Sequence, residues 1–405
     1  MKPTLKVKLV MFLTIFAFLF FFSNDFGLID VEKTSIITAI AIDKSGDEFQ
    51  VTAQIAVPEA TDANTENLKA QLSGKGTTVG SAIKDLGDIS GWFPKLAFCN
   101  LILLGNSLSQ TNVIEALDYF AKTLRVQDSA LVAISEKSAK ELLDISTPLD
   151  NISAFALQKI MLKTQGFDQD VASTDIKSFC SGHYSKNKSA YMPIVKIISA
   201  GNTTGSEQGG SSSQGQSGSS SQGNSQGGQS ASKLFDARST ALFKNGYMVG
   251  QLDENLTLMF KAFSGKFNGT TLPVDNVLDS QGRTSNYLLY IIRCTPSIKT
   301  SITDKINLDL SLNLYCKISD HDVDGSSEGM SQNTPLPKEV KTHTENLLKN
   351  YLLEMVETSK QTGCDFLGIR EKIYRFHNKD FNKFGDNYLD FLSTNISVTV
   401  EGQKL

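Results

Sequence analysis

The sequence predicts a multi-domain α+β protein with mixed or antiparallel sheets flanked by helices. Its 405 residues exceed what one ordinary hydrophobic core supports, so two or three domains are expected. Apolar residues make up 40% of the chain, which is enough to fill such cores. Segments in which every second residue is apolar alternate with segments of helical period, and this alternation indicates the α+β class.

The composition argues against nucleic-acid binding, metal binding and a disulfide framework. The net charge is −4, whereas nucleic-acid-binding proteins usually carry a basic surplus. The four histidines and five cysteines include no C-x-x-C pair and no zinc-ribbon spacing. An odd number of cysteines in a long chain favours buried free thiols. We therefore expect no cofactor, no metal and no nucleic-acid partner.

Residues 1–30 are predicted to form a signal anchor. Lys2, Lys6 and Lys8 precede an apolar run from Leu9 to Phe22, as in a secretory signal or a short membrane anchor. As a helix the run would measure about 21 Å, less than the roughly 30 Å hydrocarbon core of a bilayer. We expect the lysines inside and the rest of the chain outside. Cleavage is left open, and the alternative is a buried core helix. The expected anchor residues are Leu9, Val10, Met11, Phe12, Leu13, Ile15, Phe16, Phe18, Leu19, Phe20, Phe21 and Phe22.

Residues 31–200 are predicted to form an N-terminal α/β domain, as one body or as two subdomains. The β-prone run Ser35–Ile42 and the alternating run Phe49–Val57 flank a turn-like sequence and predict a hairpin. A loop from Pro58 to Lys75 is expected next. Thr77 and Thr78 then cap a helix whose buried face is expected to hold Val79, Ala82, Ile83, Leu86 and Ile89. Later elements are strand Cys99–Leu104, helix Asn112–Leu124, strand Ser129–Ile134, a helix to Leu143 opened by a Ser138–Glu141 capping box, helix Ile152–Leu162 and strand Met192–Ile198.

Residues 201–232 have a different composition. The tract consists almost entirely of Gly, Ser, Gln and Asn, with Glu207 as its charged residue. Such a segment cannot bury enough apolar surface to offset the entropy of ordering it. It is predicted to be a disordered linker or loop insert between two folded halves.

Residues 233–405 are predicted to form a C-terminal α+β domain, an antiparallel sheet packed on one long helix. Asn245-Gly246 lies between strands Thr240–Phe243 and Tyr247–Leu252, a strong hairpin signal. Ile306–Ile318 alternates strictly between apolar and polar residues, as expected of a half-buried strand. Further elements are helix Asn255–Phe263, strands Tyr287–Arg293 and Ile298–Ile302, a long helix Pro337–Gln361 ending at Gly363, and a last strand through Ile396, Val398 and Val400.

Catalytic motifs are missing from the sequence. It contains no H-E-x-x-H, no G-x-S-x-G and no G-x-x-x-x-G-K-[ST] pattern. The segment Gly74-Lys75-Gly76-Thr77-Thr78 resembles a phosphate loop, but its lysine precedes the second glycine, so a capped helix N-terminus is the preferred interpretation. We expect no catalytic residue and no enzymatic activity.

Trp92 and Phe93 are the candidate contact residues. They follow Gly91 and precede Pro94, in a connection between a predicted helix and a predicted strand. Aromatic residues at such a place can form an exposed partner-binding patch. The alternative is that both rings pack beneath the connection.

The order of several short motifs resembles the spore germination C-subunit family (GerAC, also called Ger(x)C) of endospore-forming bacteria. The resemblance covers most of residues 31–400. The matching segments are Thr38–Asp43, Gly76–Leu86, Phe93–Phe98 with Leu101–Gly105, Ile114–Phe120, Leu131–Leu143, Ala241–Leu252 and Cys364–Gly368.

This resemblance implies a non-enzymatic subunit of a germinant receptor on the outer face of the spore inner membrane. Such a subunit acts with two integral membrane subunits, one of them transporter-like, in the response to small nutrient germinants. Family members are typically lipoproteins, but no cysteine occurs here before Cys99, and Asn100 stands where a histidine is common. Leu9–Phe22 is therefore left to hold the protein on the bilayer.

Two other functions compete with the receptor subunit. An extracytoplasmic solute-binding protein serving a permease would need a deep pocket between domains and affinity for a free ligand. An extracytoplasmic hydrolase would need a nucleophile and a base, which the sequence does not display.

Overall fold

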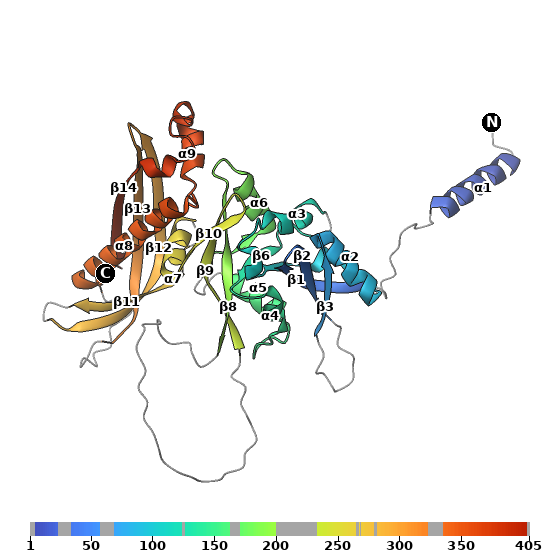
Figure 1. Cartoon of the computed structure of the whole chain (residues 1–405), viewed down its shortest axis with the longest axis horizontal. Coiled ribbons are helices and arrows are strands. Elements are labelled where there is room, and N and C mark those ends of the chain that lie inside the picture. Colours follow the sequence, from blue (N-terminus) through green and yellow to red (C-terminus); the bar gives the residue numbers. More distant parts are fainter. Residues whose placement is uncertain are drawn as a thin grey trace, which may run out of the picture.

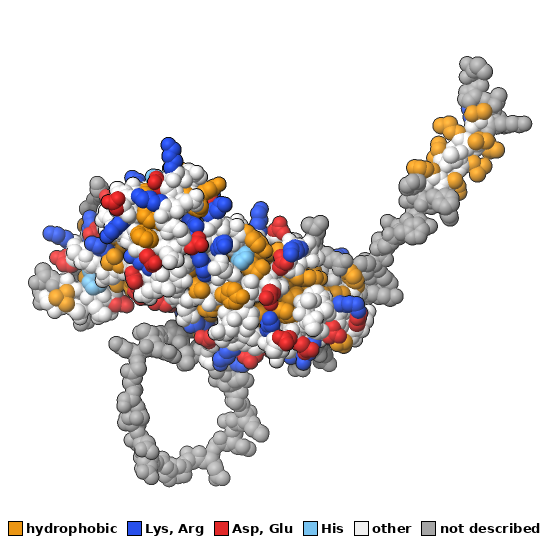
Figure 2. All heavy atoms as spheres, turned by 45° about the horizontal axis from the view of Figure 1, so that its top comes forward, with side chains coloured by type: hydrophobic (Ala, Val, Ile, Leu, Met, Phe, Trp, Pro, Cys, Tyr) orange, Lys and Arg blue, Asp and Glu red, His pale blue; other side chains and the backbone are white. Residues whose placement is uncertain are grey.

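The computed structural model describes residues 5–22, 34–56, 69–123, 126–162, 171–199, 233–264, 267, 269–278, 282–322 and 335–402. In this part of the chain the strands form two sheets that lie side by side, and helix α1 (Leu5–Phe22) lies apart from them (Figure 1). Figure 2 shows apolar side chains on α1 that the folded body does not cover. The α+β class predicted from the sequence is confirmed.

The first sheet has ten strands within the described residues. Its order is β10-β9-β8-β6-β5-β1-β2-β3, with β4 added beside β1 and β7 beside β6. The strands are β1 (Thr34–Ser45), β2 (Glu48–Ala56), β3 (Lys69–Gly76), β4 (Phe93–Lys95), β5 (Leu101–Leu104), β6 (Leu131–Ser135), β7 (Thr174–Asp175), β8 (Ser189–Ser199), β9 (Lys233–Lys244) and β10 (Tyr247–Leu252).

Helices cover both faces of this sheet, which explains why its central strands are apolar throughout. In β1, Ile40 and Ile42 join one core, while Ala39 and Ala41 join the other. The first core is closed by α2 (Val79–Ser90), α3 (Ile114–Lys122) and α6 (Ile176–Tyr184), and the second by α4 (Ala139–Asp144) and α5 (Ser153–Met161). The predicted hairpin is confirmed, because β1 and β2 pair antiparallel with Ile42 opposite Val51.

Residues 201–232, the predicted linker, lie outside the described residues. The first sheet contains strands from both sides of this segment. Strand β9 pairs antiparallel with β8, with Ala190 opposite Phe243. Strand β10 follows through the predicted Asn245-Gly246 turn. Residues 233–252 therefore complete the sheet of the N-terminal half, and the predicted division of the chain at 232/233 passes through this sheet.

The second sheet follows the order β11-β12-β13-β14 in the described chain. Its strands are β11 (Thr271–Leu278), β12 (Thr284–Ile302), β13 (Ile306–His321) and β14 (Leu392–Gly402), and α7 (Glu254–Phe263) and the long helix α8 (Lys338–Thr362) pack on it. In β13 the predicted alternation holds, with Leu308, Leu310, Leu312, Leu314 and Cys316 buried.

Two predicted features of this sheet differ in the structure. The runs Tyr287–Arg293 and Ile298–Ile302 belong to the single strand β12, whose register shifts near Leu288 and Ile291. Strand β14 runs parallel to β13, so the sheet is not wholly antiparallel. The connection through α8 and α9 (Ile369–Phe376) brings the chain back to the end of the sheet where β13 begins. Parallel pairing of two strands requires a crossover of this kind.

The predicted loop up to Lys75 is wrong at its end, because residues 69–76 form β3, paired antiparallel with β2. The reason is a close approach to helix α2. A Cβ atom on Gly74 would lie 2.3 Å from the carbonyl oxygen of Ala82, and one on Gly76 would lie 2.2 Å from Oγ of Ser81. Both glycines therefore let the strand pass under the helix.

The helix ends agree with the sequence at α2 and α8 but not at α4. Thr78 caps α2 by accepting a bond from the Ser81 N–H, and Gly363 ends α8 at φ 63°. The predicted Ser138–Glu141 capping box does not form. Instead Asp43 accepts the N–H groups of Ala139 and Lys140, each at 3.0 Å, because the end of β1 meets this helix N-terminus.

Candidate interaction surface

Trp92 and Phe93 lie in the connection from α2 to β4. Helix α2 ends at Gly91, whose φ of 71° turns the chain sharply and whose N–H donates to the Gly87 carbonyl at 2.9 Å. Strand β4 then pairs parallel with the first residues of β1, with Phe93 opposite Thr34. Phe93 and the neighbouring Trp92 are thus held beside the start of β1, which is the first strand after α1.

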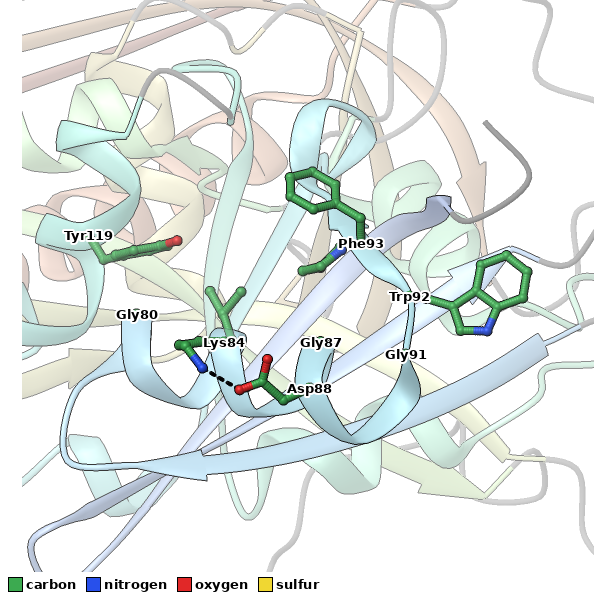
Figure 3. A pocket seen from close by; sticks show the side chains of 10 residues that line it. Gly80, Lys84, Gly87, Asp88, Gly91, Trp92, Phe93 and Tyr119 are labelled. Atoms are coloured by element: carbon green, nitrogen blue, oxygen red, sulfur yellow. Dashed lines mark hydrogen bonds and ion pairs between the residues drawn. The ribbon is translucent and has the colours of Figure 1, made fainter. Parts of the chain in front are cut away.

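The two aromatic rings have different surroundings. The rings of Trp92 and Phe93 point in opposite directions from the connection (Figure 3). Trp92 is 47% exposed, and Phe93 is half-buried beside a groove of about 590 Å³. Lys84 and Asp88 form an ion pair in this groove. The groove is lined by Gly80, Ile83, Lys84, Gly87, Asp88, Gly91, Trp92, Phe93, Pro94 and Tyr119.

Three further apolar side chains are exposed on segments that adjoin Trp92 in the chain or in the sheet. Ile89 is 70% exposed, Phe98 50% and Ile36 39%. Ile36 is paired with Lys95, three residues before Phe98, and Ile89 is in the last turn of α2. We call Ile36, Ile89, Trp92 and Phe98 the Trp92 patch. The Lys95 ammonium lies 5.8 Å from the centre of the Phe98 ring.

The exposure of Ile89 corrects the predicted buried face of its helix. Val79, Ala82, Ile83 and Leu86 are buried as expected, but Leu86 is the last buried residue of α2. The final turn of the helix therefore extends beyond the core. Helical spacing identified the face correctly, but it could not show where the sheet beneath that face stops.

The predicted anchor lies on α1. Within the described residues, no helix is both long enough and apolar enough to cross a membrane. The side chains of Leu19, Phe20, Phe21 and Phe22 lie outside the described part of the structure. The other expected anchor residues are exposed, namely Leu9, Val10, Met11, Phe12, Leu13, Ile15, Phe16 and Phe18.

The described residues were also compared with the metal-binding and phosphate-loop patterns considered in the sequence. They contain no cluster of three or more His, Cys, Asp or Glu side chains that could hold a metal. Lys75, the lysine of the phosphate-loop-like segment, lies exposed on β3. Burial raises the pKa of the Cys99 thiol to about 12, so this thiol stays protonated in the core.

A buried polar cluster joins the two halves and was not predicted from the sequence. Asp365 is fully buried between α8 and α9. Its N–H donates to Oγ of Ser189 at 3.0 Å, and its carbonyl accepts Nδ2 of Asn187 at 2.9 Å. The Lys244 ammonium donates to the Asn187 carbonyl at 2.7 Å, and burial lowers the pKa of this ammonium. We call Asn187, Ser189, Lys244, Asp365 and Tyr388 the polar joint.

Both halves of the chain match known domain families, the first half an N-terminal domain and the second half a C-terminal domain. Residues 28–197 match the family described as "Spore germination protein N-terminal domain". Residues 238–403 match the family described as "Spore germination B3/ GerAC like, C-terminal". This chain belongs to the GerAC family of spore germination proteins. The resemblance found in the sequence motifs is thereby confirmed.

A solved structure supports the fold assigned to this GerAC-family chain. It is similar to the crystal structure of the GerBC protein with a TM-score of 0.51 at 16% sequence identity. The similarity covers 93% of this chain and 100% of that chain, so the two proteins share one fold over nearly their whole length. A search of curated proteins found no match.

Proposed function

We propose that this protein is a membrane-tethered, non-catalytic subunit of a spore germinant receptor. It acts with integral membrane subunits, one of them transporter-like, in the response to small nutrient germinants. The observation that carries the proposal is the match of both halves, in order, to spore germination domains. The shared fold with the GerBC protein supports it.

We place the tether on the outer face of the spore inner membrane, and the composition of α1 supports contact with a membrane. Its side chains from Leu9 to Phe18 are apolar except for Thr14, and they are exposed on all sides of the helix. A helix that is apolar all round suits lipid rather than the surface of a soluble domain. The hydroxyl of Thr14 is internally satisfied, because it donates to the Val10 carbonyl at 2.8 Å.

Purification from spores tests the receptor assignment. The tagged full-length protein is cross-linked in spore inner membranes, solubilised in detergent and isolated, with untagged spores as the control. We expect mass spectrometry to identify a multi-spanning transporter-like protein and a second large membrane subunit. Recovery of the protein alone, or its presence in vegetative membranes only, would contradict the proposal.

A second experiment tests the tether. Leu13→Lys combined with Phe16→Lys puts two charges into the apolar helix, at roughly 3 kcal/mol each for a lysine at the centre of a membrane helix. We expect this variant to move from the membrane pellet to the carbonate-soluble fraction, while the control Lys8→Arg stays in the pellet. Equal retention of both variants would show that α1 does not hold the chain.

A further inference from the structure

The pairing of β4 with β1 brings the Trp92 patch to the part of the folded body that follows α1 in the chain. Eleven residues separate the end of α1 at Phe22 from the start of β1 at Thr34. A connection of this length spans at most about 40 Å even when fully extended. Because Thr34 is paired with Phe93, nearly the same maximum distance applies between the end of α1 and Trp92. Figure 1 shows β1 and α2 at the side of the body that faces α1.

The side chains at this place have the chemistry of a membrane–water interface. Trp92 and Phe98 are about half exposed, and Ile36 and Ile89 extend the apolar surface. Tryptophan is enriched at the headgroup level of bilayers, because its ring is apolar and its N–H needs a polar partner. Lys95 can place its stem along the apolar surface and its ammonium among phosphates.

The nearby charges permit this contact. Lys84 and Asp88 on α2 form an ion pair in the groove beside the patch. The negative charge of Asp88 is therefore balanced by a lysine. A short tether also keeps the patch at a high effective concentration near the membrane. A bilayer that holds α1 is therefore an apolar surface within reach of this patch.

We propose that the Trp92 patch rests on the outer surface of the bilayer to which α1 tethers the chain. Trp92 and Phe98 enter the boundary between headgroups and acyl chains, and Lys95 faces the lipid phosphates. The contact rests on the tether in the proposed function and adds an orientation to it. The first sheet then stands nearer the membrane, and the second sheet, at the opposite end of the body in Figure 1, stands farther away.

Trp92 is the single tryptophan of the chain, so its own fluorescence tests the contact. The full-length protein is reconstituted into vesicles of phosphatidylcholine and phosphatidylglycerol, with either ordinary or brominated acyl chains. We expect brominated lipid to reduce Trp92 emission at least two-fold and aqueous acrylamide to quench it weakly. The variant with Ile89→Ser and Phe98→Ser is expected to lose at least half of the quenching by lipid.

Phe376→Ser is the control, because Phe376 is an exposed phenylalanine on α9 in the second half, far from the patch along the chain. It should leave the quenching unchanged, and far-UV circular dichroism should show that all variants are folded. If vesicles retain the protein but Trp92 is quenched by acrylamide and not by brominated lipid, the patch proposal is overturned and the tether stands. Shielding from both quenchers also overturns it, because the patch then meets protein. If the protein does not float with the vesicles, both the tether and the patch contact fail.

Discussion

The hydroxyl of Tyr388 donates a 2.6 Å hydrogen bond to Oδ2 of Asp365 in the interior of the protein. The same carboxylate accepts the N–H groups of Ile369 at 2.8 Å and Arg370 at 2.7 Å, which begin α9. Through its backbone, Asp365 also bonds Ser189 on β8. Through its backbone and its carboxylate together, Asp365 thus connects the first sheet to the helix that follows α8.

Removal of the Asp365 carboxylate should destabilise the protein strongly. Asp365→Ala leaves two buried donors and one part-buried donor without their acceptor, and we expect a loss of about 3 kcal/mol in the free energy of unfolding. Urea unfolding of the detergent-solubilised full chain, followed by circular dichroism, measures this loss. The control is Asp386→Asn, an exposed carboxylate that pairs with Arg370 and is expected to contribute less than about 1 kcal/mol. Similar losses in the two variants would contradict the role assigned to the polar joint.

Tyr388 should make stability depend on alkaline pH. Burial raises the pKa of its hydroxyl, and the Asp365 carboxylate raises it further. A raised pKa means that the contribution to stability is complete below the unfolded value of about 10 and is lost as the pH rises above it. We expect Tyr388→Phe to be about 1 kcal/mol less stable at pH 8. Urea midpoints measured at pH 8 and pH 11 should converge between the two proteins, and a constant difference would refute the prediction.

The buried thiols should resist modification in the folded protein. Burial raises the pKa of Cys99, Cys316 and Cys364 from 9.0 to about 12, so at pH 8 they are protonated as well as inaccessible. Cys180 is partly exposed and should react first with iodoacetamide. Mass spectrometry of the labelled peptides gives the order of reaction. Labelling of Cys99 as fast as Cys180 in the native protein would show that the core around β5 is open.

Alanine at Gly74 should loosen the contact between β3 and α2. The new Cβ would collide with backbone atoms of Ala82 and Leu86, which cannot move away as a side chain could. We expect Gly74→Ala to cost about 2 kcal/mol of unfolding free energy, as overpacking typically does. Lys75→Ala, at the exposed neighbouring position, should leave the melting temperature within about a degree. A larger effect at Lys75 than at Gly74 would contradict the close packing of β3 against α2.

The elements predicted correctly are those whose pattern is local. The alternation in β13 follows from one buried and one solvated face, and the Asn245-Gly246 turn follows from the left-handed conformation that both residues adopt. The long helix α8 and its end at Gly363 are specified in the same way, by residues within a few positions of each other. The motif order along the chain was sufficient to indicate the GerAC family.

The wrong predictions depend on residues that are distant in the sequence. Ser138 has the spacing of a capping box, but Asp43, 95 positions earlier, occupies the N-terminus of α4. Ile89 has the helical spacing of a core residue, but the core ends at Leu86. In each case the deciding neighbour is brought there by the sheet, and no local pattern indicates it.

The family, the α+β class, most strands and helices, and the candidate contact at Trp92 follow from the sequence alone. The exposure of Ile36 and Phe98, and the bonds by which Asp365 joins α9 to β8, became visible in the folded chain. The difference lies in the range of the interactions. Secondary structure and turns follow from backbone preferences and hydrophobic period over a few residues, whereas exposed patches and buried polar clusters depend on which distant segments the fold places against each other.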